Sequence, residues 1–219
     1  MIPDAGPEFV CAMEAVLDVY ARPFDALRPV VCLDEKRKQL VRHTRTGFTD
    51  AHGVRHEDYE YERNGVGVLY MVCEPLGGRR EVRVEASQDR LAWARTVVYM
   101  AETMYPEAER LTLVQDNLSA HKPSALYEIL PPERARAILR RLEIVHTPTH
   151  GSWLNIAEIE LSVLSKQALG GRIADEETLR RSVTSWSCER TSAQKGVAWH
   201  FTTADARIKL ARLYPTVIS

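Results

Sequence analysis

The sequence predicts an α/β protein in which helices flank a mixed sheet. Two apolar runs, residues 30–33 and 111–115, are rich in branched side chains and suit short strands covered on both faces. Residues 67–74 and 81–85 are β-prone and are separated by a Gly-Gly pair, which predicts a hairpin. With 219 residues, of which 45% are hydrophobic and 27% charged, the chain has the composition of a folded protein with one well-cored domain.

The first predicted element is a helix. Residues 8–20 carry apolar side chains at helical spacing, and two prolines then mark a connector into the first strand. We therefore expect residues 1–28 to form a lead-in helix and linker, and residues 29–219 to form the main domain. The polar stretch 35–63, with scattered His and Gly, predicts a long loop or a loosely ordered insertion.

After the hairpin, helices and strands alternate. Ser87 is the expected N-cap of a helix that runs to Tyr105, where Pro106 closes it. Prolines and apolar runs predict the later elements in this order: strand 111–115, short helix 123–130, helix 132–142, a strand from Ile144 and a helix from about Asn155. The succession strand, hairpin, helix, strand, helix, strand, helices is that of a mixed sheet flanked by helices.

Charge and cysteine content limit the kinds of function. With 29 Lys and Arg against 30 Asp and Glu, the net charge is −1, whereas a self-sufficient nucleic-acid binder normally has a clear basic excess. Any affinity for DNA must therefore be local or supplied elsewhere. Local clusters of Lys and Arg exist, although each is also explained as a solvated charged face: Lys36 to Lys38, Arg79-Arg80, Arg134 with Arg136, Arg140-Arg141 and Arg180-Arg181.

The sequence also argues against secreted and membrane-spanning classes. The four cysteines form no CxxC pair, so neither a zinc knuckle nor a disulfide framework is indicated. No run approaches the roughly 18 apolar residues of a membrane span, and no basic segment followed by an apolar stretch opens the chain. We expect a cytosolic protein without membrane contact.

Three acidic residues are the candidates for chemistry. Asp34 and Asp116 each follow an apolar run, and Glu158 lies on a predicted helix. Ligand sites in open α/β sheets lie at the carboxyl ends of strands, and carboxylates gathered there repel one another unless a cation joins them. Magnesium prefers such hard oxygen ligands, so the pattern suggests a two-metal site for phosphoryl transfer. The alternative for each aspartate is a side chain that caps a turn.

Periodicity alone leaves the third acid open. Glu158 and Glu160 lie on either side of the apolar stripe of their helix, so either could face the site. Glu35 is expected to point away from Asp34, because successive side chains of a strand alternate between its faces.

Three segments, in this order, carry a resemblance to a known family: Leu33-Asp34-Glu35, residues 114–121 (VQDNLSAH) and residues 146–158 (HTPTHGSWLNIAE). They resemble the catalytic domain of bacterial insertion-sequence transposases of the mariner-related superfamily, the DDE superfamily endonucleases. Residues 201–210 also look familial. In that family the third acid lies in an Asn-x-x-Glu pattern at the start of a helix, which here selects Glu158 over Glu160. The resemblance implies a ribonuclease H-like fold, in which the first and fourth strands lie side by side and each delivers an aspartate.

The resemblance also implies an activity. It is magnesium-dependent cleavage of transposon ends, with manganese as a substitute, followed by attack of the freed 3′ hydroxyl on target DNA. Asp34 would bridge two metal ions, and Asp116 and Glu158 would each complete one side. Asn117 and His121 belong to the second motif and could orient Asp116 or touch phosphate. N-capping by Asn117 and a hydrogen-bonded histidine at a helix start are equally compatible with the sequence.

The resemblance further implies a homo-oligomer assembled on double-stranded DNA in the bacterial cytosol and nucleoid. Relatives carry helix-turn-helix DNA-binding modules before the catalytic domain, and we expect this chain to lack them. Two alternatives to a catalytic domain remain. One is a catalytically silent, truncated transposase that acts as an interaction partner or regulator. The other is a structure-directed nuclease of the same fold.

Overall fold

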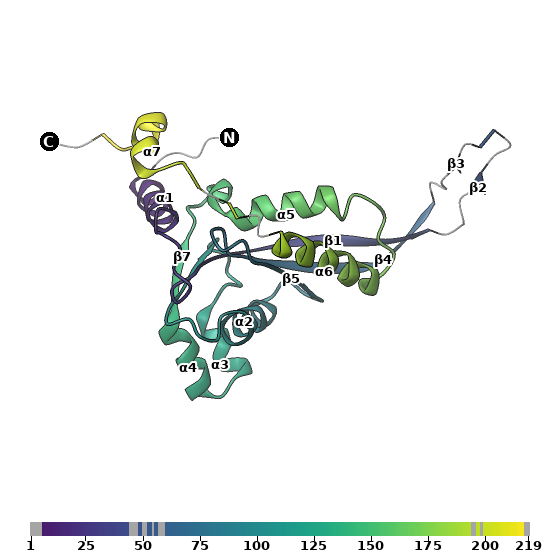
Figure 1. Ribbon diagram of the computed structural model, residues 1–219, viewed down its shortest axis with the longest axis horizontal. Helices are drawn as coiled ribbons and strands as arrows, with labels where there is room; N and C mark the ends of the chain where they lie inside the picture. The colour runs from purple at the N-terminus through teal and green to yellow at the C-terminus, as the bar shows by residue number, and fades with distance from the viewer. Residues whose placement is uncertain are drawn as a thin grey trace.

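A computed structural model describes residues 6–43, 48–49, 52–53, 55–56, 60–193, 196–197 and 199–216. Within them, five strands form one sheet in the order β5-β4-β1-β6-β7 (Figure 1). β1 is antiparallel to β4, whereas β6 is parallel to β1 and to β7, so the sheet is mixed as predicted. Their bounds are Val30–His43 for β1, Tyr61–Cys73 for β4, Arg80–Glu85 for β5, Leu111–Gln115 for β6 and Leu142–His146 for β7. A separate two-stranded sheet pairs β2 (Phe48–Thr49) with β3 (Arg55–His56).

Helices cover both faces of the sheet, which confirms the predicted α/β class. On one face lie α1 (Pro7–Tyr20), α5 (Ile156–Gln167) and α6 (Glu176–Ser192), with α7 (Thr203–Lys209) beside α1 (Figure 1). On the other face lie α2 (Arg90–Tyr99), α3 (Leu126–Ile129) and α4 (Pro132–Arg141). A π-helical turn, η1 (Met100–Met104), continues α2, and short 3₁₀ turns flank α3 (η2, Pro123–Ala125), α5 (η3, Ser152–Leu154) and α7 (η4, Ala211–Leu213).

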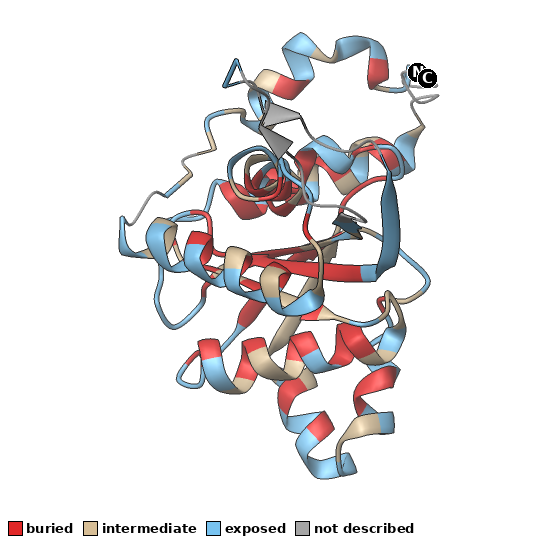
Figure 2. Ribbon diagram, turned by 90° about the vertical axis from the view of Figure 1, so that its right-hand side faces the viewer, coloured by how far each residue is buried: buried red, intermediate tan, exposed pale blue. Residues whose placement is uncertain are grey.

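The sheet separates two apolar layers because successive strand residues point to opposite faces. In β1, Cys32 packs with α1 and α5, whereas Val31 and Leu33 pack with α2. Figure 2 shows the buried colour concentrated on the strands and on the helix surfaces turned towards them. α1 contributes six buried side chains to the first layer, so it packs on the sheet as part of the same core. The division of the chain at residue 28 stays a prediction.

The polar stretch 35–63 was expected to be a loop, and this expectation is wrong for both of its ends. β1 continues to His43 and pairs residue by residue with β4, down to Tyr61, with a bulge between Gln39 and Val41. Figure 1 shows this strand pair extending past the ends of α5 and α6. Backbone pairing between two strands needs no apolar side chains, so hydropathy alone could not detect it. The middle of the stretch lies mostly outside the described residues.

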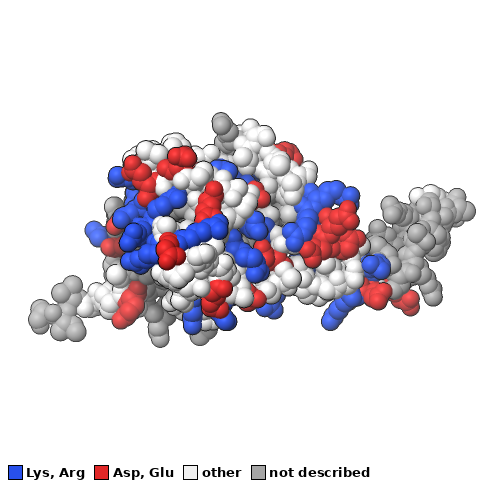
Figure 3. Space-filling view, turned by 90° about the horizontal axis from the view of Figure 1, so that it is seen from below, with Lys and Arg blue, Asp and Glu red and all other residues white. Residues whose placement is uncertain are grey.

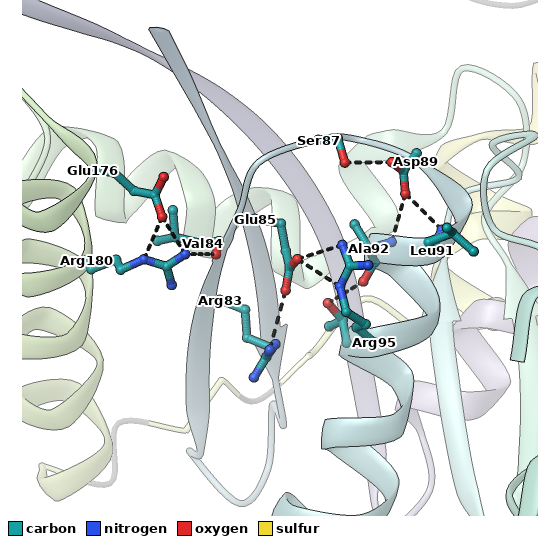
Figure 4. A network of polar contacts seen from close by, with 11 residues as sticks. Arg83, Val84, Glu85, Ser87, Asp89, Leu91, Ala92, Arg95, Glu176 and Arg180 are labelled. Atoms are coloured by element: carbon teal, nitrogen blue, oxygen red, sulfur yellow. Dashed lines mark hydrogen bonds and ion pairs between the residues drawn. The ribbon is translucent and has the colours of Figure 1, made fainter. Parts of the chain in front are cut away.

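The predicted hairpin is confirmed, whereas the predicted start of the following helix is not. β4 and β5 pair as predicted, and Gly78 adopts the positive φ of 71° that its turn requires. The predicted N-cap of α2 is wrong, because Asp89 holds that position. Asp89 accepts bonds of 2.9 Å from the backbone N–H groups of Leu91 and Ala92, and Ser87 instead donates its hydroxyl to Asp89 (Figure 4).

Several of the basic clusters are engaged in ion pairs with nearby acids. Arg180 donates to Glu176 and to the carbonyl of Val84, which ties α6 to β5 (Figure 4). Arg134 pairs with Glu102. On the surface formed by α2, α3 and α4, Lys and Arg lie beside Asp and Glu (Figure 3). Paired surface charge therefore accounts for Arg134 and Arg180. In the part of the chain that the structure describes, no helix is long and apolar enough to cross a membrane.

Candidate active site

The parallel pairing of β1 with β6 brings Asp34 and Asp116 side by side. Its register runs from Val30 opposite Thr112 to Cys32 opposite Val114, and two further residues along each chain lead to Asp34 and Asp116. Asp116 directly follows β6, as predicted. Asp34 lies inside β1 and not at its end, because β1 continues beyond the point where β6 stops. The two carboxyl groups are close enough that Asp116 raises the pKa of Asp34.

α5 brings the third acid to the same place through its N-cap. Asn155 is buried, and its Oδ1 accepts the backbone N–H of Ala157 at 3.1 Å. The Nδ2 of the same side chain donates to the carbonyl of Leu33 at 2.9 Å, next to Asp34 in β1. One side chain therefore begins the helix and fixes it to the strand. Glu158 lies in the first turn of α5, and it too raises the pKa of Asp34.

The two glutamates of α5 have different surroundings. Glu160 is buried and accepts two bonds of 2.8 Å from the guanidinium of Arg80, with a third from Arg190 at 3.2 Å. Its carboxylate is thus fully occupied in holding α5 to β5 and α6. In Glu158, Oε2 is buried, and among the described residues no donor reaches it. Of the two candidates, the structure leaves Glu158 with a carboxylate oxygen ready for a ligand.

Asp34 lies in surroundings that disfavour its charged form. Burial is the largest cause, and it raises the pKa of Asp34 to about 7. The backbone N–H of Glu35 opposes this shift, whereas the charges of Glu35, Asp116 and Glu158 add to it. A cation beside these carboxylates would relieve both the burial and the repulsion.

His121 connects the site to a buried polar network. Its Nδ1 lies 2.9 Å from Oδ1 of Asp116, and its Nε2 lies 3.1 Å from Oε2 of Glu35. The ring stacks on Trp93, at a centroid distance of 6.0 Å. Burial lowers the pKa of His121, but the bonds to Asp116 and Glu35 outweigh it and raise the pKa to about 10. Of the roles that the sequence left open for His121, a contact with Asp116 is present in the structure.

The structure excludes one of the roles left open for Asn117 and gives Glu35 a contact that the sequence did not predict. Asn117 is exposed and does not cap the next helix, which begins at Pro123 with Lys122 as its N-cap. Glu35 was expected to point away from Asp34. It does occupy the opposite face of β1 from Asp34, yet the loop after β6 brings His121 to that face, so Glu35 is bonded into the site. Gln88, which donates to Glu35 at 2.8 Å, was not predicted at all, because no local pattern connects it to residue 35.

The donor set fits a hard divalent cation. Asp34, Asp116 and Glu158 supply carboxylate oxygens, and one oxygen of Glu158 is buried without a hydrogen-bond partner among the described residues. The main causes of the shifted pKa of Asp34 include no Lys or Arg whose charge would balance these acids. Within the described residues, however, no three His, Cys, Asp or Glu side chains form a ready-made metal-binding group. Small side-chain movements, or oxygens from a substrate phosphate, would have to complete the coordination.

Comparison with known proteins identifies the family. The family model described as DDE superfamily endonuclease matches residues 29–180, which is well over half of the chain. The chain belongs to the DDE superfamily endonucleases. The matched segment of this DDE endonuclease contains Asp34, Asp116 and Glu158, and it confirms the family that the three motifs suggested. A search of the curated protein sequences found no match.

Solved structures similar to this DDE endonuclease include complexes of the Mos1 transposase. The Mos1 mariner paired-end complex with Mg has a TM-score of 0.61 at 15% identity, covering 95% of this chain and 63% of that chain. The Mos1 strand transfer complex has a TM-score of 0.58 at 14% identity, covering 94% of this chain and 60% of that chain. At these identities the likeness establishes the shared ribonuclease H-like fold. The DDE endonuclease chain spans about 60% of the length of the Mos1 chain in the strand transfer complex.

Proposed function

We propose that this chain is the catalytic domain of a transposase, which cleaves DNA strands at the ends of an insertion sequence and joins them to target DNA. The observation that carries the proposal is the convergence of Asp34, Asp116 and Glu158 from two strands and one helix, with a buried and unpartnered oxygen on Glu158. Membership of the DDE superfamily endonucleases supports the reaction class.

Each carboxylate has a distinct place in the proposed site. Asp34 lies in the sheet, where the charges of both other acids raise its pKa, and it would hold the divalent cations together with them. Asp116 is held by His121, and Glu158 lies in the first turn of α5, so each can complete one side. Divalent cations bound there would activate the attacking oxygen and stabilise the leaving oxygen of an in-line displacement. The similar Mos1 complexes with Mg and with Mn support magnesium as the cation and manganese as its substitute.

The proposed substrate is double-stranded DNA. The Mos1 structures include a complex with the left transposon end and paired-end complexes, which support transposon ends as the substrate and an oligomer on DNA as the active form. The net charge of −1 favours recognition of the ends by a DNA-binding part outside this domain. We infer that the chain acts when such a part is joined to it or supplied by a partner.

The first test is manganese binding by the whole chain, measured by calorimetry beside Asp34→Asn and Asp116→Asn. We expect binding that each substitution weakens strongly, because each removes a charged ligand from the site. Asp18→Asn is the control, since Asp18 accepts the hydroxyl of Thr203 on the exposed surface between α1 and α7. Manganese binding that both site substitutions leave unchanged would contradict the proposal.

The second test separates the proposed function from its alternatives. Cleavage and strand transfer are measured on duplexes that end in the inverted repeats flanking the gene, and on duplexes with scrambled ends. Activity that needs the repeats and is lost in Asp116→Asn supports a transposase. Cleavage without regard to the repeats indicates a structure-directed nuclease. Inhibition of a full-length transposase that survives Asp116→Asn indicates a silent interaction partner.

A further inference from the structure

A chain of hydrogen bonds, buried at His121 and Glu35, leads away from the proposed metal site on the α2 side of the sheet. It runs from Asp116 to His121, from His121 to Glu35, and from Glu35 to Gln88. The side chains of His121 and Glu35 are each 1% exposed, so the hydrogen bond between them is shielded from solvent. Trp93 stacks on the ring of His121. Trp93 donates its own N–H to Gln115 at 2.9 Å, and this bond holds the indole in place against the His121 ring.

We propose that Glu35, held by Gln88, is a positioning residue of this site: it bonds the far nitrogen of His121 and so fixes the ring whose near nitrogen contacts Asp116. The inference rests on the proposed function, because it assigns the residue that orients one of the three carboxylates. Glu35 does not touch the place where the three acids converge, since it lies on the other face of β1 from Asp34.

The geometry at Glu35 explains why a carboxylate is needed there. Its two oxygens accept from two different directions, Oε1 from Gln88 at 2.8 Å and Oε2 from His121 at 3.1 Å. Gln88 is itself oriented, because its Oε1 accepts the Nε–H of Arg37 at 2.8 Å and its amide N–H₂ therefore faces Glu35. A glutamine at position 35 has one acceptor oxygen and one N–H₂ donor, so it cannot accept from both Gln88 and a protonated His121.

The expected consequence is an effect on cation binding at a distance. Partners that hydrogen-bond the groups holding a metal ligand typically change metal affinity or activity by about 10- to 100-fold when they are removed. We therefore expect Glu35→Gln to weaken Mn²⁺ binding, or to lower kcat, by about 10-fold or more. KM for DNA should stay unchanged, because Glu35 is buried and contacts no substrate.

The test compares Glu35→Gln with Glu74→Gln in the whole chain. Glu74 is also buried and accepts the hydroxyl of Tyr105, but it is bonded to no residue of the site, so it controls for loss of a buried carboxylate. Mn²⁺ affinity, kcat, KM and Tm are measured for both. A purely structural role of Glu35 would lower Tm in both variants and leave Mn²⁺ affinity and kcat alone.

A double-mutant cycle tests whether Glu35 acts through His121. Glu35→Gln should have little further effect on Mn²⁺ affinity in a His121→Gln background, because the ring it positions is gone. If Glu35→Gln does not fold, Gln88→Met carries the same test, since it removes the donor that holds Glu35 at the edge of the network. Equal effects of Glu35→Gln with and without His121 would overturn the inference.

The failure of this inference can be distinguished from failure of the proposed function. If Asp116→Asn abolishes Mn²⁺ binding and cleavage while Glu35→Gln and Gln88→Met match the wild type within about twofold, the positioning role is wrong and the proposed function stands. If the folded wild type neither binds Mn²⁺ nor cleaves DNA, both fall together.

Discussion

Glu158 and Glu160 lie two residues apart on α5, yet their carboxylates have opposite surroundings. Glu160 is enclosed by Arg80 and Arg190, whereas Glu158 keeps a buried oxygen without a hydrogen-bond donor among the described residues. Burial of a carboxylate is tolerated when its oxygens are bonded and is costly when they are not. At the scale of residues, therefore, one glutamate stabilises the fold and the other is available for function.

This difference predicts opposite outcomes for two similar substitutions. Glu160→Gln breaks a buried ion pair, so we expect it to lower the free energy of unfolding by about 3–5 kcal/mol. Glu158→Gln should not lower stability, because it removes a charge from a poorly bonded carboxylate, and it should abolish Mn²⁺ binding and strand cleavage. Urea unfolding and calorimetry with Mn²⁺ measure the two effects. A loss of stability in Glu158→Gln as large as that in Glu160→Gln would contradict this assignment.

The raised pKa of Asp34 predicts a pH-dependent stability of the metal-free protein. Burial raises the pKa of Asp34 in the folded state to about 7, above the ordinary 3.8. Between these pH values the folded protein holds a proton that the unfolded chain has released, so stability falls as pH rises from about 4 to about 7. Asp34→Asn removes this penalty, which at about 1.4 kcal/mol per pKa unit is at most about 4 kcal/mol.

We therefore expect Asp34→Asn to have a higher Tm than the wild type at pH 8 in the presence of a chelator, and nearly the same Tm at pH 4. Because the penalty requires the charged carboxylate, excess Mg²⁺ should raise the Tm of the wild type at pH 8 and leave that of Asp34→Asn largely unchanged. A Tm difference that is equal at both pH values would show that charge on Asp34 is not the cause.

At the scale of elements, the position of α5 depends on a single capping residue. Asn155 caps α5 and at the same time bonds the carbonyl of Leu33 in β1. Most N-caps only satisfy the first turn of their own helix, as Asp175 does for α6 by accepting the N–H of Thr178 at 2.8 Å. The cap of α5 also sets where Glu158 meets the strand that carries Asp34.

We expect Asn155→Ala to cost about 2–3 kcal/mol, because it removes a cap together with a buried hydrogen bond to the Leu33 carbonyl. Asp175→Ala is the matched control, and its loss should be smaller because only a cap is removed. Urea unfolding gives both values. Mn²⁺ affinity should fall in Asn155→Ala alone, since only this helix carries an acid of the site. Equal losses of stability in the two variants would indicate that the bond to Leu33 contributes nothing.

At the scale of the whole molecule, α1 supports the site from a distance in sequence. The hydroxyl of Tyr20, at the end of α1, donates to the carbonyl of Leu154 at 2.7 Å, directly before the cap of α5. Met13 and Leu17 are fully buried in the layer that α1 shares with α5 and the sheet. A helix expected to lead into the domain is thus packed where α5 begins.

This packing predicts that α1 unfolds together with the rest of the protein. Met13→Ala should cost about 2–5 kcal/mol, the usual range for a buried large side chain, and should shift one cooperative transition. Leu27→Ala is the control, because Leu27 is exposed and its side chain should contribute less than about 0.5 kcal/mol. An early, separate transition in Met13→Ala, seen by circular dichroism, would show that α1 folds independently of the sheet.

The sequence by itself determined the class of fold, most of the apolar strands and helices, and the three motifs with their acids. Hydrophobic periodicity indicates which side chains are buried. The motifs indicate the local structure around the acids, with Asp116 directly after β6 and Glu158 shortly after a helix cap. Contacts between residues far apart in the sequence produce no such local pattern. Only the tertiary structure decided that the polar end of β1 is paired, that Glu160 is taken by Arg80, and that Glu35 and Gln88 reach His121, because each depends on which residues the sheet order brings together.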